Sequence, residues 1–75
     1  PIHLLVVPND HVANLVEIQD SQTFTQLMSV IGQVIKEQQI ESFRLVANTG
    51  ANAGQSVFHL HFHILAGRAF SWPPG

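Results

Sequence analysis

Residues 56–65 read Ser-Val-Phe-His-Leu-His-Phe-His-Ile-Leu, and this stretch decides the fold that we expect. Successive side chains of a β-strand point to opposite faces of the sheet. We therefore predict a strand over 57–65 whose apolar side chains share one face and pack under a helix: Phe58, Leu60, Phe62 and Ile64. The opposite face would carry the imidazoles of His59, His61 and His63, in a row about 13 Å long.

The rest of the chain predicts two more strands and one long helix. Residues 2–7 and 43–48 are rich in branched apolar side chains, as strands are. Asp20 is a typical N-cap, and the apolar residues behind it recur at helical spacing as far as about Gln38. The small and polar residues 49–54 predict a loop that joins 43–48 to the histidine strand, so these two strands should pair antiparallel. This order of elements indicates an α+β fold in a single domain over 1–75.

The composition narrows the class of protein. The chain has 5 histidines against 3 lysines and arginines, and its formal net charge is −2 at pH 7. This balance speaks against electrostatic binding of nucleic acid or of an anionic membrane. Charged residues make up only 11% of the chain, so we expect a partner to cover part of the surface. No apolar run approaches the ~18 residues of a membrane span, and we expect a cytoplasmic protein.

Three histidines on one strand point to chemistry, and the residues alone leave two readings open. A His-x-His pair on a strand can chelate a zinc ion. Alternatively, one imidazole attacks a phosphorus atom while its neighbours hold charge and move protons. Gly54-Gln55-Ser56 precede the strand and would cradle an anion with backbone N–H groups and a hydroxyl. A metal site does not need such a cradle, and the carboxylate closest in sequence is Glu41, so we favour phosphoryl chemistry. The lack of cysteine excludes a thiolate zinc site and a cysteine nucleophile.

The segment His59-Leu60-His61-Phe62-His63-Ile64-Leu65 matches the signature of the histidine triad superfamily of nucleotide hydrolases and transferases. The flanking Asn48-Thr49-Gly50, Gly54-Gln55-Ser56-Val57, Ala66-Gly67-Arg68 and Trp72-Pro73-Pro74-Gly75 make the chain similar to the Hint branch. Members of this branch are histidine triad nucleotide-binding proteins that act as purine nucleoside phosphoramidases. The resemblance implies an antiparallel sheet of about five strands with helices on one side, paired into a homodimer. The family usually begins well before Pro1, so we expect an N-terminally truncated domain with fewer strands.

The resemblance also implies a role for each residue of the site. His61 is the expected nucleophile, which would form a nucleotidyl-histidine from an AMP-type purine nucleoside 5′-phosphoramidate. His59 would orient His61, chiefly through its backbone carbonyl, and His63 would contact the phosphate and assist the leaving amine. The other residues would bind the phosphate, fix the 5′ side of the nucleotide or stand beside the site: Ser56, Gly54, Gln55, Asn48, His3 and Trp72. The family needs neither a metal nor another cofactor for this reaction.

Several alternatives stay open. A dinucleoside polyphosphate hydrolase or a nucleotidyl transferase of the same superfamily would use the same triad, although the tail 72–75 argues against both. A non-catalytic nucleotide-binding or adaptor module would bind nucleotide without a covalent intermediate. A metal-binding protein would use the histidine row as ligands. We take His11 as a loop residue, and we expect Gly32 in the helix to allow close approach by another backbone, such as that of a partner chain.

Overall fold

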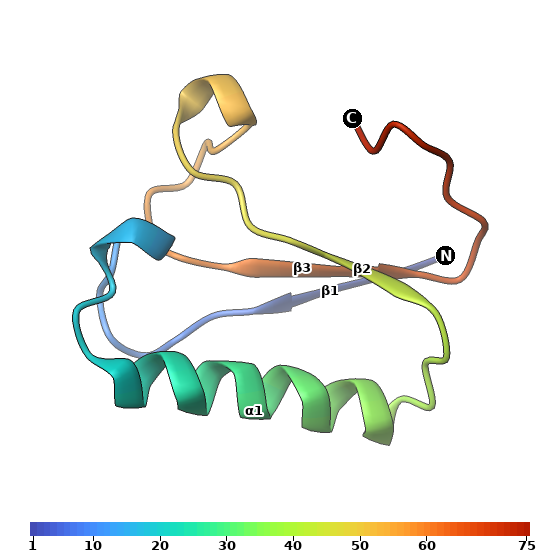
Figure 1. The fold of residues 1–75 in the computed structure, drawn as a ribbon, viewed down its shortest axis with the longest axis horizontal. Helices are drawn as coiled ribbons and strands as arrows, with labels where there is room; N and C mark the ends of the chain where they lie inside the picture. The colour runs from blue at the N-terminus through green and yellow to red at the C-terminus, as the bar shows by residue number, and fades with distance from the viewer.

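One antiparallel sheet and one long helix make up this structure, a computed structural model that covers residues 1–75. The strands are β1 (Ile2–Val6), β2 (Phe43–Val46) and β3 (Phe62–Ala66), in the order β1-β3-β2. Helix α1 (Ser21–Glu37) runs along one side of the sheet (Figure 1). Two short 3-10 helices, η1 (Leu15–Glu17) and η2 (Ala51–Ala53), lie in the connections. The predicted α+β class is confirmed, and so is the antiparallel pairing of the last two strands.

Strand β3 is central because it carries the most apolar face of the sheet. Its residue Ile64 lies opposite Leu4 of β1 on one side and Leu45 of β2 on the other. Ile64 is completely buried, and Leu60 and Phe62 are nearly so. These side chains pack against the buried residues of α1, which form the rest of the core: Leu27 and Ile31. Burial of such side chains contributes about 1.5–3 kcal/mol each.

The strand boundaries and one facing residue differ from the prediction. We expected a strand over 57–65, but the ladder begins only at Phe62, which lies opposite Val6, the last residue of β1. Residues 57–61 have no pairing partners in β1 or β2, so no ladder holds their side chains on alternate faces. Phe58 was expected under the helix and is instead 57% exposed. The strands predicted over 2–7 and 43–48 are also shorter and end at Val6 and Val46.

Helix α1 begins and ends close to the predicted residues. The carboxylate of Asp20 caps it by accepting a hydrogen bond from the backbone N–H of Gln22 at 2.9 Å, which satisfies one of the free donors of the first turn. The helix ends at Glu37, with Gln38 as its C-cap. A Cβ at Gly32 would meet nothing within 4 Å, so no other backbone of this chain approaches that glycine. No helix here combines the length and the apolar character that crossing a membrane requires.

Candidate functional site

The face of the sheet away from α1 carries a chain of histidine contacts. In the register of the sheet, His63 of β3 lies opposite Leu5 and His3 of β1 lies opposite Leu65. The two histidines are therefore diagonal neighbours on one face, a spacing that long and aromatic side chains can bridge. Their ring nitrogens, Nε2 of His3 and Nδ1 of His63, are 2.7 Å apart. The ring of His61 lies 5.0 Å from that of His63, centroid to centroid.

The ring of His61 is held by its own backbone two residues upstream. Its Nδ1–H donates to the carbonyl oxygen of His59 at 2.8 Å. A carbonyl can only accept, so the proton of neutral His61 must be on Nδ1. The other ring nitrogen, Nε2, then carries a free lone pair. An imidazole with this tautomer is prepared to act as a nucleophile or a base.

The ring of His59 does not join the row that the alternation predicted. Its Nε2–H donates to the carbonyl oxygen of Pro8 at 3.1 Å, and its ring meets the edge of His11 at a centroid distance of 5.3 Å. Consecutive ring contacts therefore run from His61 through His63 to His3. The ring of His59 turns away from this row because residues 57–61 precede the ladder and do not keep strand geometry. His59 reaches the site through its carbonyl, and His11 lies in an exposed loop against the ring of His59.

The surroundings of His63 favour its neutral form. Burial lowers its pKa below the usual 6.5, and the like charges of His61 and His3 lower it further. When neutral His63 accepts a hydrogen bond at Nδ1 from His3, its own proton lies on Nε2. The pair His3–His63 can therefore pass a proton from one strand to the next. A group of this kind can protonate a leaving atom beside His61.

The glycine-rich loop before the triad is folded tightly on itself. Gly50 and Gly54 adopt φ angles of 90° and 98°, which side-chain-bearing residues rarely reach. The backbone N–H groups of Gly54 and Gln55 donate to the carbonyls of Ala51 and Gly50 at 3.0 and 3.1 Å. These two amides, which we expected to contact phosphate, are thus already paired inside the loop.

Two polar residues of the loop region remain available to a ligand. Ser56 is exposed, and neither its hydroxyl nor its N–H makes a hydrogen bond within the chain. Asn48 is brought beside Gly54, because its Nδ2 lies 3.8 Å from the position of a Cβ on that glycine. The loop therefore presents a free hydroxyl and a carboxamide close to the start of the triad.

The side chain of Gln55 points inward, which the sequence did not indicate. It is 4% exposed and is the buried polar residue of the chain. Its Oε1 accepts from the N–H of Gly50 at 2.8 Å, and its Nε2 donates to the carbonyls of Ala13 and Val57 at 2.8 and 3.2 Å. Every hydrogen-bonding group of this amide is used. A glutamine between glycine and serine gives no sequence signal for such a role.

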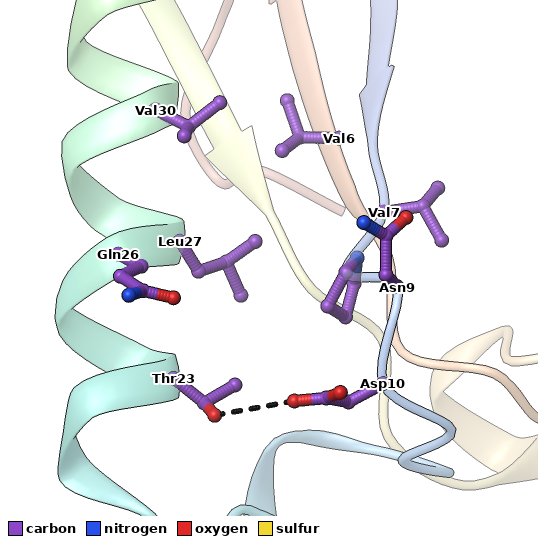
Figure 2. A pocket seen from close by; sticks show the side chains of 9 residues that line it. Val6, Val7, Asn9, Asp10, Thr23, Gln26, Leu27 and Val30 are labelled. Atoms are coloured by element: carbon purple, nitrogen blue, oxygen red, sulfur yellow. Dashed lines mark hydrogen bonds between the residues drawn. The ribbon is translucent and has the colours of Figure 1, made fainter.

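Two cavities of about 310 Å³ flank the end of β1, and they differ in chemistry. One opens beside the triad and is mainly apolar, with these lining residues: Leu5, Val7, Val57, His59 and His61. The other lies between α1 and the residues that follow β1 (Figure 2). There the hydroxyl of Thr23 donates to Asp10 at 3.4 Å, and no histidine lines the space. The first cavity is the one that can present a ligand to His61.

Trp72 lies away from the histidines of this chain. It is 83% exposed and lines a groove along β2 with Arg44, to which no histidine contributes. The tail is held there because the guanidinium of Arg44 donates to the carbonyl of Ser71 and lies over the ring of Phe70. Of the residues expected at the site, the structure thus brings together the rings of His61, His63 and His3. It turns the ring of His59 towards Pro8 and leaves Trp72 outside the site.

Comparison with known proteins places these features in a family. Residues 1–70 match the HIT domain. An uncharacterized HIT-like protein of Synechococcus elongatus is 42% identical over 78 residues, and the match covers 100% of this chain and 68% of that protein. The crystal structure of a HIT family hydrolase from Legionella pneumophila superposes with a TM-score of 0.91 at 33% identity, over 100% of this chain and 70% of that one.

A second solved structure extends the likeness to a protein named for its ligand. A hypothetical histidine triad nucleotide-binding protein from Sulfolobus tokodaii superposes with a TM-score of 0.77 at 37% identity. The match covers 95% of this chain and 50% of that protein. By its sequence, its sheet and its cluster of histidines, this chain belongs to the HIT domain family.

Proposed function

We propose that this chain is a nucleotide-binding hydrolase that cleaves the P–N bond of purine nucleoside 5′-phosphoramidates. The observation that carries the proposal is the 2.8 Å hydrogen bond from Nδ1 of His61 to the carbonyl of His59, which leaves Nε2 free to attack. The similar protein from Legionella pneumophila is a HIT family hydrolase, and that from Sulfolobus tokodaii is called nucleotide-binding. Both support this class of function.

The reaction would proceed in two steps. In the first, the lone pair on Nε2 of His61 forms a bond to the α-phosphorus, and the bond from phosphorus to the amine nitrogen breaks. The departing amine takes a proton from Nε2 of His63, which is replaced through Nδ1 when His3 holds the extra proton. In the second step, the oxygen of a water molecule forms a bond to phosphorus, and the bond from phosphorus to Nε2 of His61 breaks with its electron pair returning to Nε2. The proton that the water loses returns to the His3–His63 pair. The products are an amine, a nucleoside monophosphate and free His61.

The surroundings of the histidines support a nucleotide as substrate. The cavity lined by Leu5, Val7 and Val57 offers an apolar wall beside the nucleophile, as a purine ring or a ribose face requires. The free hydroxyl of Ser56 and the carboxamide of Asn48 would contact the phosphate and the 5′ side of the nucleotide. Neutral donors and imidazoles would thus hold the phosphate without lysine or arginine.

The Hint branch and a homodimer belong to the same proposal. The tail 72–75 and the loop 48–57 carry the resemblance to the branch. A chain in which only 11% of residues are charged, and in which Phe58 and Trp72 are 57% and 83% exposed, has apolar surface that a second copy would cover. Sedimentation velocity at micromolar concentration should show a dimer, and a monomer would contradict this part.

The central test is the covalent intermediate. The protein would be mixed with adenosine 5′-phosphoramidate, quenched within milliseconds and weighed intact, while AMP release is followed separately. We expect an adenylyl adduct and steady AMP release, both of which His61→Gln should abolish. His11→Gln is the matched control, since it removes an exposed loop imidazole and should stay within about twofold of the wild type, as surface changes do.

The same assay separates the alternatives. Turnover that survives His61→Gln would overturn the assignment of the nucleophile. AMP binding by calorimetry without any adduct would identify a non-catalytic module. If the protein hydrolysed a dinucleoside polyphosphate in preference to the phosphoramidate when both are present, the chain would belong to another branch of the superfamily. Activity should be unaffected by EDTA. Stoichiometric zinc in the purified protein would favour the alternative of a metal-binding protein.

A further inference from the structure

The tautomer of His61 depends on a single peptide group that the sheet does not hold. The carbonyl that accepts from Nδ1 of His61 belongs to His59, in the peptide that joins His59 to Leu60. The ladder of the sheet begins only at Phe62. Strand pairing therefore leaves this peptide group free to rotate. Another contact must fix the direction in which its carbonyl points.

That contact comes from the loop that follows β1. The N–H of Leu60, on the same peptide group, donates to the carbonyl oxygen of Val12 at 2.6 Å. The peptide group is thus bonded at both ends, to Val12 through its N–H and to His61 through its carbonyl. Hydrogen bonds in series polarise one another, so the Val12 bond strengthens the acceptor that His61 uses.

The buried amide of Gln55 clamps the two segments that this bond joins. Its Nε2 donates to Ala13, the neighbour of Val12, and to Val57, two residues before His59. Its Oε1 accepts from Gly50 and so ties both segments to the glycine-rich loop. The side chain is 4% exposed, and loss of its amide would break all three of these hydrogen bonds at once.

We propose that Gln55 is a positioning residue for His61: its side-chain amide holds segment 12–13 against segment 57–60 and so fixes the His59 carbonyl that sets the tautomer and the aim of the His61 ring. Gln55 touches neither a substrate nor the reacting nitrogen. Its effect on rate rests on the function proposed above, whereas its effect on the tautomer does not.

The test replaces the amide by an apolar chain of equal length. Gln55→Met keeps the volume and removes the donors and the acceptor. Two-bond proton–nitrogen correlation spectra of the ring-labelled protein at pH 8 report which nitrogen of His61 carries the proton. We expect the wild type to show the Nδ1–H form, and Gln55→Met to show a mixture with the Nε2–H form. The kcat should fall about 10- to 100-fold, as a misplaced reacting group does, with KM within about threefold.

Two controls keep the result interpretable. Gln33→Met removes an exposed amide of α1, whose one hydrogen bond is to Glu37 at 3.3 Å, and should match the wild type in tautomer and kcat. Circular dichroism verifies that each variant is folded. If Gln55→Met does not fold, Gln55→Glu serves in its place, because it keeps the shape and an acceptor for Gly50, while at pH 8 its charged carboxylate cannot donate to Ala13 and Val57.

The outcomes separate this inference from the proposed function. A folded Gln55 variant that keeps the Nδ1–H form of His61 overturns the inference, even when its kcat falls, because that loss would be merely structural. An unchanged kcat in an active protein overturns it as well. If the wild type turns over no phosphoramidate, the proposed function fails, and the tautomer alone still decides the role of Gln55.

Discussion

The Nε2 of His3 and the Nδ1 of His63 lie 2.7 Å apart, although 60 positions separate the two residues in the sequence. Antiparallel pairing of β1 with β3 creates this contact, because it sets Leu5 opposite His63 and His3 one diagonal step away. The contact couples the protonation of the two rings. Both the reaction that we propose and the stability of the fold should therefore respond to changes in either residue.

Replacing His3 should raise the pKa of His63. His3→Gln removes one of the like charges that lower this pKa and keeps an N–H that can donate to Nδ1. The rise should be partial, because burial is the largest cause of the lowering and His61 still contributes. An NMR titration of the His63 ring protons measures the change directly. A pKa that stays in place or falls would show that the two rings are not electrostatically coupled.

The lowered pKa of His63 should make the protein less stable in mild acid. The unfolded chain takes up this proton at about pH 6.5, whereas the folded chain takes it up only at lower pH. Between these two values the unfolded state binds more protons, so the free energy of unfolding falls as the pH falls. Above pH 6.5 the His63 ring is neutral in both the folded and the unfolded state, so it no longer changes the free energy of unfolding.

Urea unfolding between pH 8 and pH 5 measures this effect. His63→Gln carries no titrating group at that position, so its stability should decline less steeply over the same range. Equal slopes for His63→Gln and the wild type would contradict the assignment. The remaining four histidines are common to both proteins, which makes the difference between them the informative quantity.

The buried residue Ile64 should carry a large share of the stability. It is fully buried between α1 and the sheet, so Ile64→Ala removes apolar contacts and leaves a cavity. We expect a loss of about 2–5 kcal/mol in the free energy of unfolding. Val16→Ala is the matched control, since Val16 is 79% exposed and its truncation should change stability by no more than about 0.5 kcal/mol. Similar losses in both variants would show that the core lies elsewhere.

Two glycines should respond in opposite directions to alanine. Gly67 has φ 88°, and a Cβ there would lie 3.0 Å from the backbone N of Ile2. Gly67→Ala should cost at least about 1–2 kcal/mol for the left-handed backbone alone. Gly32 lies within α1 and has open space around it, so Gly32→Ala should stabilise the folded chain by up to about 1 kcal/mol. Thermal unfolding compares the two, and a destabilised Gly32→Ala that also loses its dimer would identify that glycine as an interface position.

Local patterns account for the parts of the fold that the sequence predicted well. The cap at Asp20 and the apolar stripe of α1 depend on neighbours within a turn or two of helix. The burial of Phe62 and Ile64 follows from alternation within one strand. The hydrogen bond that Nδ1–H of His61 donates to the carbonyl of His59 also joins close neighbours. The resemblance to the family already implied this contact.

Contacts between distant segments account for what the sequence did not predict. Phe58 has the same alternation as Phe62 and Ile64, yet it is exposed, because no partner strand continues the ladder as far as residue 58. The ring of His59 turns to the carbonyl of Pro8 for the same reason. The inward amide of Gln55 joins residues from three parts of the chain, and no local pattern records where such partners will lie.

The sequence by itself determined the class of fold, the helix, the buried face of the central strand and the set of histidines, because each rests on short-range periodicity or on a contiguous motif. Only the tertiary structure decided where the ladder stops, which histidine rings touch and what holds the His59 carbonyl. Those features arise when β1 and the loop after it are brought against residues 55–63. Their energies belong to pairs of residues tens of positions apart, and a sequence pattern carries no measure of such pairs.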